Sequence, residues 1–235
     1  SRLHQYDYVF LHREATPVGF PIMERLVAKV WRKKLIYDFD DAIWLANTSI
    51  ENRIAAWLKY PSKVKRIIKW SYKISAGNQF LVDFASEINP NVICNPTTID
   101  TQNRHIPKED SKDSQIIGWT GTHSTLKYLE TLRPVLERLS ARFEFTFLII
   151  ADKAPDLPFP NQQFKCWNKE TEIADLNQID IGVMPLEDDI WAKGKCGFKA
   201  LQFMALEMPV LVSPVGVNRE IVEEGVNGFH CSSEE

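Results

Sequence analysis

Short apolar runs alternate with amphipathic stretches along most of this 235-residue chain. Asp7–His12 and Lys34–Phe39 are rich in β-branched and aromatic residues, a composition that predicts two strands. Between them, Pro21–Trp31 carries apolar residues at helical spacing. A strand, a helix and a second strand in this order form a βαβ unit, which is typical of a parallel sheet. The chain is therefore predicted to open as an α/β fold.

The remainder of the first half continues the same alternation. A helical stretch follows the second strand, and a proline at position 61 is expected to bend it. Two further short strands then flank another helix, and a polar, proline-marked segment comes after them. The predicted elements are a helix over Ile50–Ser75, strands at Ile74–Gly77 and Val92–Asn95, a helix at Gln79–Glu87 and a linker over 99–114.

The second half repeats the order of strand and helix. This repetition predicts two Rossmann-like domains facing a cleft, with residues 1–98 as the first domain and 115–235 as the second. The predicted elements of the second domain are strands at Gln115–Trp119, Phe145–Ile150, Phe164–Cys166, Ile179–Pro185 and Pro209–Ser213 and helices at Thr125–Ser140, Lys169–Gln178, Phe198–Leu206 and Asn218–Glu224.

The stretch Asp180–Phe229 is the most informative segment of the chain, and it includes the predicted loop Leu186–Gly197. The loop follows a predicted buried strand, and α/β sheets hold their ligands in loops at the carboxyl ends of strands. Lys193 and Lys195 lie in this loop, and Lys199 lies in the first turn of the next predicted helix. Because a helix amino end and nearby lysines both favour anions, the segment predicts a phosphate-binding site.

From this loop to the last predicted helix the sequence reads GFKALQFMALEMPVLVSPVGVNREIVEEGVNGF. It resembles the donor-binding region of GT-B glycosyltransferases, specifically glycosyltransferase family 4 (group 1). The blocks VFLHREATPVGFP, LIYDFDDAIW and IIGWTGTHSTLKYLETL resemble other parts of one bacterial branch of that family. The resemblance implies a GT-B fold with an incomplete first domain, because the family's first strand with its Gly-rich loop and its closing helices are not found.

The donor site is predicted from both the residues and the resemblance. Gly121 lets the backbone approach a diphosphate, and the nearby hydroxyls and backbone N–H groups can hold it. An ordinary helix cap at Thr122 or Ser124 and a solvated lysine face are the structural alternatives. The resemblance places the ribose near Gln202, where the family usually has glutamate. The predicted donor-binding residues are Gly121, Thr122, Ser124, Lys195, Lys199, Gln202, Asn218 and Glu220.

Asp38, Asp40 and Asp41 cluster at the end of the second predicted strand. The resemblance places Asp40 near a family histidine that lies over the reacting sugar, so Asp40 is a candidate to orient the acceptor or to balance oxocarbenium charge. Two alternatives stay open: a D-x-D metal site, and a structural role in capping the next helix or pairing with Arg13. His12 closes the first strand at the same edge and is the second catalytic candidate.

The charged residues are distributed unevenly along the chain. Residues 1–98 hold 14 Lys and Arg against 9 Asp and Glu, whereas the rest of the chain holds 14 against 22. The basic stretch 57–73 predicts either peripheral membrane contact or the outer face of a helix, and it lacks any motif for nucleic acid. The four cysteines are widely separated and are expected to be reduced and structural.

The sequence thus predicts a glycosyltransferase that moves a hexosyl unit, with retention, from a nucleotide-sugar to a cell-surface glycan or lipid-linked acceptor. It predicts no metal and no cofactor beyond the donor substrate. A cytoplasmic location, with the inner face of the membrane as a variant, follows from the absence of a signal peptide or membrane-spanning run. The alternatives are a non-catalytic nucleotide-sugar-binding or partner subunit, which includes an inactive fragment, and a metal-dependent transferase that uses the DFDD segment.

Overall fold

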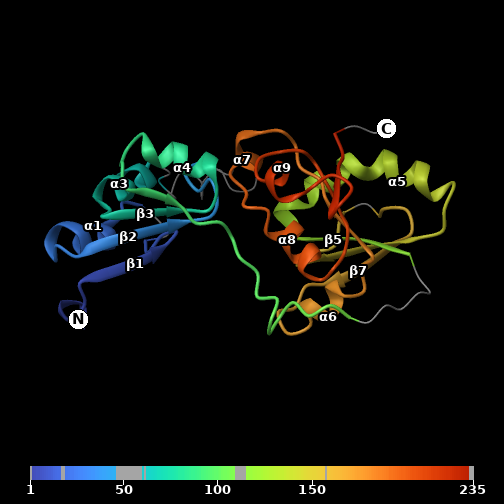
Figure 1. The fold of residues 1–235 in the computed structure, drawn as a ribbon, viewed down its shortest axis with the longest axis horizontal. Helices are drawn as coiled ribbons and strands as arrows, with labels where there is room; N and C mark the ends of the chain where they lie inside the picture. The colour runs from blue at the N-terminus through green and yellow to red at the C-terminus, as the bar shows by residue number, and fades with distance from the viewer. Residues whose placement is uncertain are drawn as a thin grey trace. The chain divides into compact units, whose positions relative to one another are not determined.

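The computed structural model describes residues 2–16, 19–45, 60, 62–108, 115–156 and 158–232. The chain divides into two compact units (Figure 1). Ser1–Thr97 and Asp189–Cys196 form the first unit, and Thr98–Asp188 and Gly197–Glu235 form the second. Residues 189–196 fall within the range 115–235 of the sequence-based division, yet they pack with the first unit.

The first unit is built on a four-stranded parallel sheet of order β1-β2-β3-β4. In the register of this sheet, His12 is paired with Asp38 and Asp38 with Ser75, which aligns three polar residues across three neighbouring strands. Because all four strands run in the same direction, these residues approach the carboxyl edge of the sheet together. The strands are β1 (Tyr8–His12), β2 (Lys34–Phe39), β3 (Lys73–Ala76) and β4 (Val92–Cys94).

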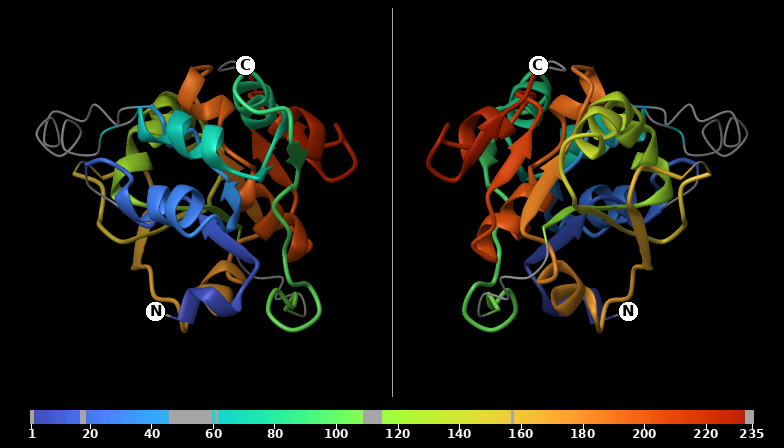
Figure 2. Two further views of the ribbon diagram at one scale, coloured as in Figure 1. Left: turned by 90° about the vertical axis from the view of Figure 1, so that its left-hand side faces the viewer. Right: turned by 90° about the vertical axis from the view of Figure 1, so that its right-hand side faces the viewer.

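The helices of the first unit pack on this sheet. α3 (Lys63–Trp70) contacts β2, and α4 (Gln79–Ser86) contacts β3 and β4 (Figure 1). α1 (Ile22–Arg25) continues as the π-helical η2 (Leu26–Val30), and α1 lies against α3 (Figure 2). β2 alternates buried and partly exposed residues, and its buried face forms the centre of the core with α3 and α4.

The predicted long helix of the first half corresponds to α3, although its residues 50–59 and 61 lie outside the described residues. α3 ends at Trp70, five residues before the predicted end at Ser75. Asn89 explains why α3 ends there, because its buried amide donates to the carbonyl oxygens of Ile68 and Ser71, at 2.9 Å each. Those carbonyls belong to the helix end and would otherwise lack partners.

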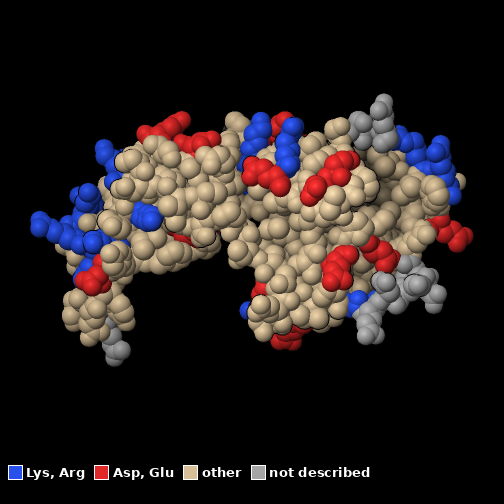
Figure 3. Space-filling model, viewed as in Figure 1, with Lys and Arg blue, Asp and Glu red and all other residues tan. Residues whose placement is uncertain are grey.

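The basic stretch is the outer side of α3. Val64, Ile67 and Ile68 are buried, whereas Lys65, Arg66 and Lys69 are exposed, as in an amphipathic helix on a sheet. Trp57 and Lys59 lie outside the described residues. Figure 3 shows a group of Lys and Arg side chains at one end of the first unit, and other Lys and Arg side chains on the second unit. Membrane contact through this stretch stays a prediction.

The second unit contains a six-stranded parallel sheet of order β10-β9-β8-β5-β6-β7. From β5 the chain moves outward to β6 and β7, returns to pair β8 with β5, and then moves outward on the other side. The order therefore reverses between β5 and β8, the position at which open α/β sheets bind ligands. The strands are β5 (Ile116–Gly121), β6 (Thr146–Ala151), β7 (Gln162–Cys166), β8 (Ile181–Met184), β9 (Val210–Val212) and β10 (Gly228–His230).

Alternate residues of β6 serve two separate cores. Phe147 and Ile149 pack with apolar residues of η4 (His123–Leu132) and α5 (Arg133–Ser140). Leu148 and Ile150 pack with α6 (Glu172–Leu176) and α8 (Phe198–Ala205). The helices therefore cover both faces of the sheet, as expected for strands that are hydrophobic on both sides.

Some elements differ from the sequence-based expectation. The predicted helix Thr125–Ser140 is a 3-10 helix followed by an α-helix, with Pro134 in the first turn of α5, where a missing N–H is tolerated. α7 (Ile190–Lys193) lies inside the predicted loop Leu186–Gly197 and is capped by Asp189. β10 was not predicted either, and the last helix, α9 (Asn218–Ile221), is shorter than expected.

The cysteines do not share one environment. Cys196 is buried and its Sγ donates to the carbonyl oxygen of Asp40 at 3.1 Å, whereas Cys94, Cys166 and Cys231 are exposed. Burial, together with the nearby charge of Asp40, raises the pKa of the Cys196 thiol to about 12. The expectation of a structural cysteine therefore fits Cys196 best.

We predict that Cys196 resists alkylation in the folded protein. At pH 8 its thiol stays protonated, and the thiolate is the reactive form. Iodoacetamide labelling followed by peptide mass spectrometry should modify Cys94 under native conditions and Cys196 only after denaturation. Labelling of both cysteines at the same rate in the native protein would contradict this packing.

Candidate functional site

The carboxyl edge of the first sheet carries a chain of hydrogen bonds that begins at His12. The Nδ1 atom of His12 lies 2.7 Å from the Oδ2 atom of Asp38. Ser75 donates its hydroxyl to the other oxygen of Asp38 at 2.6 Å, and Asn95 donates to the Ser75 hydroxyl at 3.2 Å. The sheet register places these residues side by side, so the chain of bonds orients the half-exposed imidazole ring.

Asp40 is paired with Arg13. The Nε atom of Arg13 donates to the Oδ1 atom of Asp40 at 2.8 Å, and the Nε2 atom of His12 lies 4.0 Å from the same oxygen. Burial raises the pKa of Asp40, but the hydrogen bond and charge of Arg13 outweigh it, and the net pKa is lowered. The structure thus shows the arginine pairing that the sequence left open, and it keeps Asp40 ionised beside His12.

Asp41 has a third kind of environment. Its Oδ1 atom accepts a hydrogen bond from the backbone N–H of Ala42 at 3.0 Å. Burial raises its pKa, and the positive charge of Lys195 opposes that rise. Asp38, Asp40 and Asp41 therefore bond to different partners, and the described part of the chain contains no cluster of three or more His, Cys, Asp or Glu side chains suited to a metal ion.

In the second unit, Gly121 and Lys199 come together at the end of β5. A Cβ atom added to Gly121 would lie 2.7 Å from the Nζ atom of Lys199 and 2.1 Å from the ring of Trp119. The same Nζ atom lies 4.7 Å from the centroid of the Trp119 ring, a distance suited to a cation–π interaction. The buried tryptophan thus holds a lysine beside a glycine at the point where the strand order reverses.

Thr122 and Ser124 lie at the start of η4, directly after this glycine. Thr122 is the N-cap residue; its backbone N–H donates to the Thr125 hydroxyl at 3.1 Å, and its own hydroxyl lies 2.9 Å from that of Ser124. The capping alternative is therefore present in the structure. Both side chains are exposed, so capping leaves them accessible to a ligand.

The amino end of α8 is the other feature near Lys199. It begins after Gly197, which has a φ of 70° in the left-handed region, and no described side chain caps its first N–H groups. A Cβ atom on Gly197 would lie 3.8 Å from the Oδ1 atom of Asn218. That oxygen is buried and has no hydrogen-bond partner among the described residues. Uncapped N–H groups at a helix end favour an anion.

Gln202 and Glu220 do not join this group through any described contact. Gln202 is buried one turn after Lys199 on α8, where its Nε2 atom lies 3.4 Å from His105 and donates to Glu172 at 3.3 Å. Glu220 is exposed on α9. The structure therefore brings Gly121, Thr122, Ser124 and Lys199 together. Asn218, the first residue of α9, lies near Gly197 before α8, whereas Lys195 lies in the first unit.

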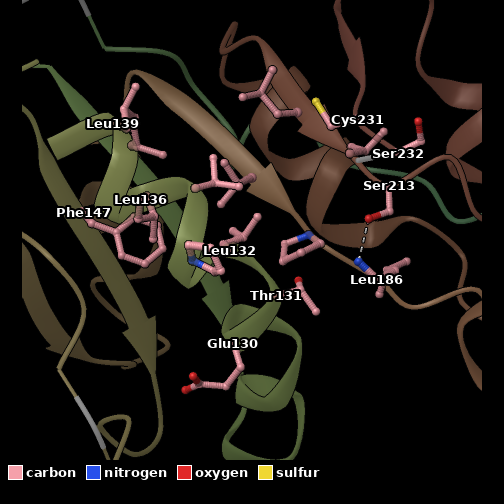
Figure 4. Close-up of a pocket in the computed structure, with 17 residues that line it drawn as sticks. Glu130, Thr131, Leu132, Leu136, Leu139, Phe147, Leu186, Ser213, Cys231 and Ser232 are labelled. Atoms are coloured by element: carbon pink, nitrogen blue, oxygen red, sulfur yellow. Dashed lines mark hydrogen bonds between the residues drawn. The ribbon is translucent and has the colours of Figure 1, made fainter. Parts of the chain in front are cut away.

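An apolar pocket of about 680 Å³ lies elsewhere in the second unit (Figure 4). α5 forms one side, and residues of β5, β8 and β9 form its floor. Leu186 donates its backbone N–H to the Ser213 hydroxyl at its rim, at 2.9 Å. None of the predicted donor-binding residues lines this pocket, and among the described residues that line it Glu130 alone is charged. Its lining does not suit a diphosphate.

Sequence reasoning missed several partners of the predicted residues. The ring contact between Trp119 and Lys199 was not predicted, because it depends on the distance between β5 and α8. The pairing of His123 with Asp152 was missed as well: the Nδ1 atom and the backbone nitrogen of His123 each lie 2.6 Å from that carboxylate. The available signal was an aspartate two residues after the predicted strand at Phe145–Ile150.

The fold and this site define a class: two Rossmann-like α/β units of the GT-B type, with anion-binding features at a strand-order reversal. Residues 114–235 match the family model for "Glycosyl transferases group 1". Because this match covers more than half of the chain, the chain belongs to the group 1 glycosyltransferase family. No significant match was found among curated protein sequences.

Solved structures of glycosyltransferases share the fold. Anabaena Alr3699/HepE in complex with UDP-glucose has a TM-score of 0.65 at 14% identity, over 99% of this chain and 66% of that protein. Sucrose-phosphate synthase from Thermosynechococcus elongatus has a TM-score of 0.64 at 10% identity, over 98% and 62%. A glycosyltransferase from Rickettsia africae has a TM-score of 0.56 at 12% identity, over 97% and 85%. The predicted fold class is confirmed by these structures.

Two further findings concern the length of the chain and its helices. The chain spans slightly less than two thirds of the HepE and sucrose-phosphate synthase chains. Among the described helices, none combines the length and the hydrophobicity that a membrane crossing requires.

We predict that Gly121→Ala disturbs a ligand site, whereas Gly118→Ala in the same strand disturbs only packing. Both new methyl groups would collide with side chains, at 2.1 Å from Trp119 and 2.3 Å from Ile179 respectively. Overpacking of about 1–3 kcal/mol should lower the melting temperature of each variant by roughly 2–10 °C. Only Gly121→Ala displaces Lys199, so only this variant should lose UDP affinity in calorimetry. Equal UDP affinity in both variants would contradict the site.

Proposed function

We propose that this protein is a retaining glycosyltransferase that moves a hexosyl unit from a nucleotide-sugar to a cell-surface glycan or lipid-linked acceptor. Membership of the group 1 glycosyltransferase family and the GT-B fold support the transferase class. The observation that carries the proposal is the juxtaposition of Gly121 and Lys199 at the strand-order reversal of the second sheet. The crystal structure of HepE in complex with UDP-glucose makes UDP-glucose the first donor to test.

The donor diphosphate would bind where backbone and charge both favour an anion. Gly121 leaves room for a phosphate to approach the end of β5. Lys199 supplies a point charge that its contact with Trp119 holds in place. The uncapped N–H groups of α8 add the positive end of the helix dipole, and the hydroxyls of Thr122 and Ser124 can donate to phosphate oxygens.

The departing nucleoside diphosphate carries more charge in the transition state than in the bound donor. Groups already oriented toward that charge accelerate bond cleavage, because they need no rearrangement during the reaction. Lys195 and Lys199 would serve this purpose. Asn218, Glu220 and Gln202 remain predictions for the rest of the donor, and Gln202 would have to act from its buried position on α8.

His12 and Asp40 are the proposed catalytic pair. Arg13 keeps the pKa of Asp40 low, so its carboxylate is ionised at neutral pH and can stabilise positive charge on the sugar ring. His12 is oriented by Asp38 and lies 4.0 Å from the Asp40 carboxylate. That the reaction needs no metal, that the protein is cytoplasmic and that it contacts the membrane all stay predictions from the sequence.

We predict that Lys199→Ala weakens UDP binding by at least tenfold in isothermal titration calorimetry. Removal of a positioned lysine costs a charge-assisted contact, whose loss is worth about 1.5–3 kcal/mol. Lys127→Ala is the matched control. The Nζ atom of Lys127 lies 4.8 Å from the centroid of the Tyr128 ring, in the same kind of contact as that of Lys199, but the Lys127 side chain is exposed on η4. The proposal fails if wild-type protein binds none of UDP, GDP or ADP, or if both variants bind alike.

Catalysis is tested by release of UDP from UDP-glucose, because water can slowly accept the glucosyl unit in place of the natural acceptor. We predict that Asp40→Asn keeps UDP-glucose affinity within about threefold and lowers UDP release at least tenfold, a loss of about 1.4 kcal/mol or more. Because the pKa of Asp40 is lowered, its carboxylate should support release down to about pH 5.

Two other outcomes would point to the alternatives. Tight binding without any UDP release would favour a non-catalytic nucleotide-sugar-binding subunit. Release that stops in a chelator and returns with manganese would favour the metal-dependent reaction at the DFDD segment.

A further inference from the structure

We propose that Asn78 is a positioning residue that fixes Lys195 in the first unit. This inference rests on the proposed function, because the task assigned to Lys195 is to bind the donor diphosphate. Asn78 follows β3 at the carboxyl edge of the first sheet, and Lys195 comes from a segment more than a hundred residues later in the chain. Neither the family match, which covers 114–235, nor the sequence analysis gave Asn78 a role.

Asn78 is a buried side chain that makes hydrogen bonds in two directions. Its Oδ1 atom accepts from the backbone N–H of Leu81 at 2.9 Å and so caps α4. Its Nδ2 atom donates to the carbonyl oxygens of Lys193 and Lys195, at 3.2 and 2.9 Å. One amide therefore joins the start of α4 to the backbone of 193–195.

Two glycines allow the segment to pack closely against its neighbours. A Cβ atom on Gly77 would lie 2.5 Å from the Sγ atom of Cys196, and one on Gly194 would lie 2.5 Å from the Cβ atom of Ala42. The thiol of Cys196 also donates to the carbonyl oxygen of Asp40. The segment Asp189–Cys196 is thus packed against the loops that follow β2 and β3, in the same unit.

This attachment decides which charges surround Lys195. Its positive charge opposes the rise in the pKa of Asp41, and its Nζ atom lies 5.9 Å from the centroid of the Trp191 ring. Asp41 in turn is partly buried near Arg13 and Asp40. A lysine on a released segment would be a mobile solvated charge, whereas the clamp holds it at the edge that carries His12 and Asp40.

The choice of asparagine distinguishes positioning from simple capping. Serine, aspartate and asparagine cap helices about equally well, because capping needs only an oxygen acceptor. Of these three, asparagine alone also supplies an N–H₂ group that can donate to two carbonyl oxygens. Asn78→Ser and Asn78→Asp therefore keep the cap and remove the clamp.

Asn89 is a matched control in the same unit. It is also buried; its Nδ2 atom donates to the carbonyl oxygens of Ile68 and Ser71, and its Oδ1 atom accepts from the N–H of Asn91 at 3.0 Å. The pattern of hydrogen bonds is the same as that of Asn78. Asn89, however, closes the end of α3, away from residues 189–196.

The experiment compares Asn78→Ser, Asn89→Ser and wild-type protein by hydrogen exchange and UDP-glucose calorimetry. We expect both variants to lose thermal stability. Amides of 190–196 should exchange at least tenfold faster in Asn78→Ser and unchanged in Asn89→Ser. UDP-glucose affinity should fall at least fivefold in Asn78→Ser and stay within twofold in Asn89→Ser.

A mutant cycle separates positioning from a general loss of structure. In a Lys195→Ala background, Asn78→Ser should weaken UDP-glucose binding by less than twofold, because the group that it positions is gone. If Asn78→Ser does not fold, Asn78→Asp provides the isosteric variant. Gly194→Ala provides a second way to release the segment, because its methyl group displaces the same segment from Ala42 without changing Asn78.

The outcomes separate this inference from the proposed function. If wild-type protein does not bind UDP-glucose or UDP, the proposed function fails, and with it the role of the clamp in donor binding. If wild-type protein binds but Asn78→Ser binds equally well with a released segment, the positioning role is overturned. Unchanged exchange of 190–196 in both Asn78→Ser and Asn78→Asp would overturn the clamp itself.

Discussion

Parallel strand pairing is the constraint on which the candidate site depends. In each unit it brings the carboxyl ends of neighbouring strands to one edge, whatever their separation in sequence. In the first sheet this alignment makes His12, Asp38 and Ser75 neighbours across three strands. In the second sheet the strand order reverses between the paired strands β5 and β8, and the residues that follow both strands lie at one edge.

Charge in the first unit is organised by pairing each acidic side chain with a different partner. Asp38 bonds to His12 and Ser75, Asp40 bonds to Arg13, and Asp41 bonds to a backbone N–H. The consequence for the pKa differs accordingly: it is lowered for Asp40 and raised for Asp41. Three carboxylates in four positions thus have three separate structural settings, and Arg13 lowers the pKa of the one with which it is paired.

The sequence predicts the regular parts of the structure well because their signals are local. β2 matches the predicted strand Lys34–Phe39, whose alternating apolar residues form the core. β8, α8 and β9 follow the predicted order for the same reason. Local signals also located Gly121 and Lys199, since a glycine after a strand and a lysine at a helix start are visible in sequence.

Non-local contacts could not be predicted in this way. The capping ability of Asn78 is a local property, but its bonds to the carbonyls of 193 and 195 join positions 115 and 117 residues apart. The same holds for Lys199 and Trp119, which meet only after β5 and α8 are packed. α7 was missed because four residues give too short a period to detect, and its cap Asp189 was assigned to the loop.

The central claim is that the carboxyl edge of the second sheet binds the nucleotide-sugar. Hydrogen exchange of wild-type protein with and without saturating UDP tests it most directly, because it reports the location of binding. The account predicts protection of backbone amides in 121–125 and 197–200, with little change around the apolar pocket beside α5. Protection confined to that pocket, or absent from both segments despite measurable UDP binding, would contradict it.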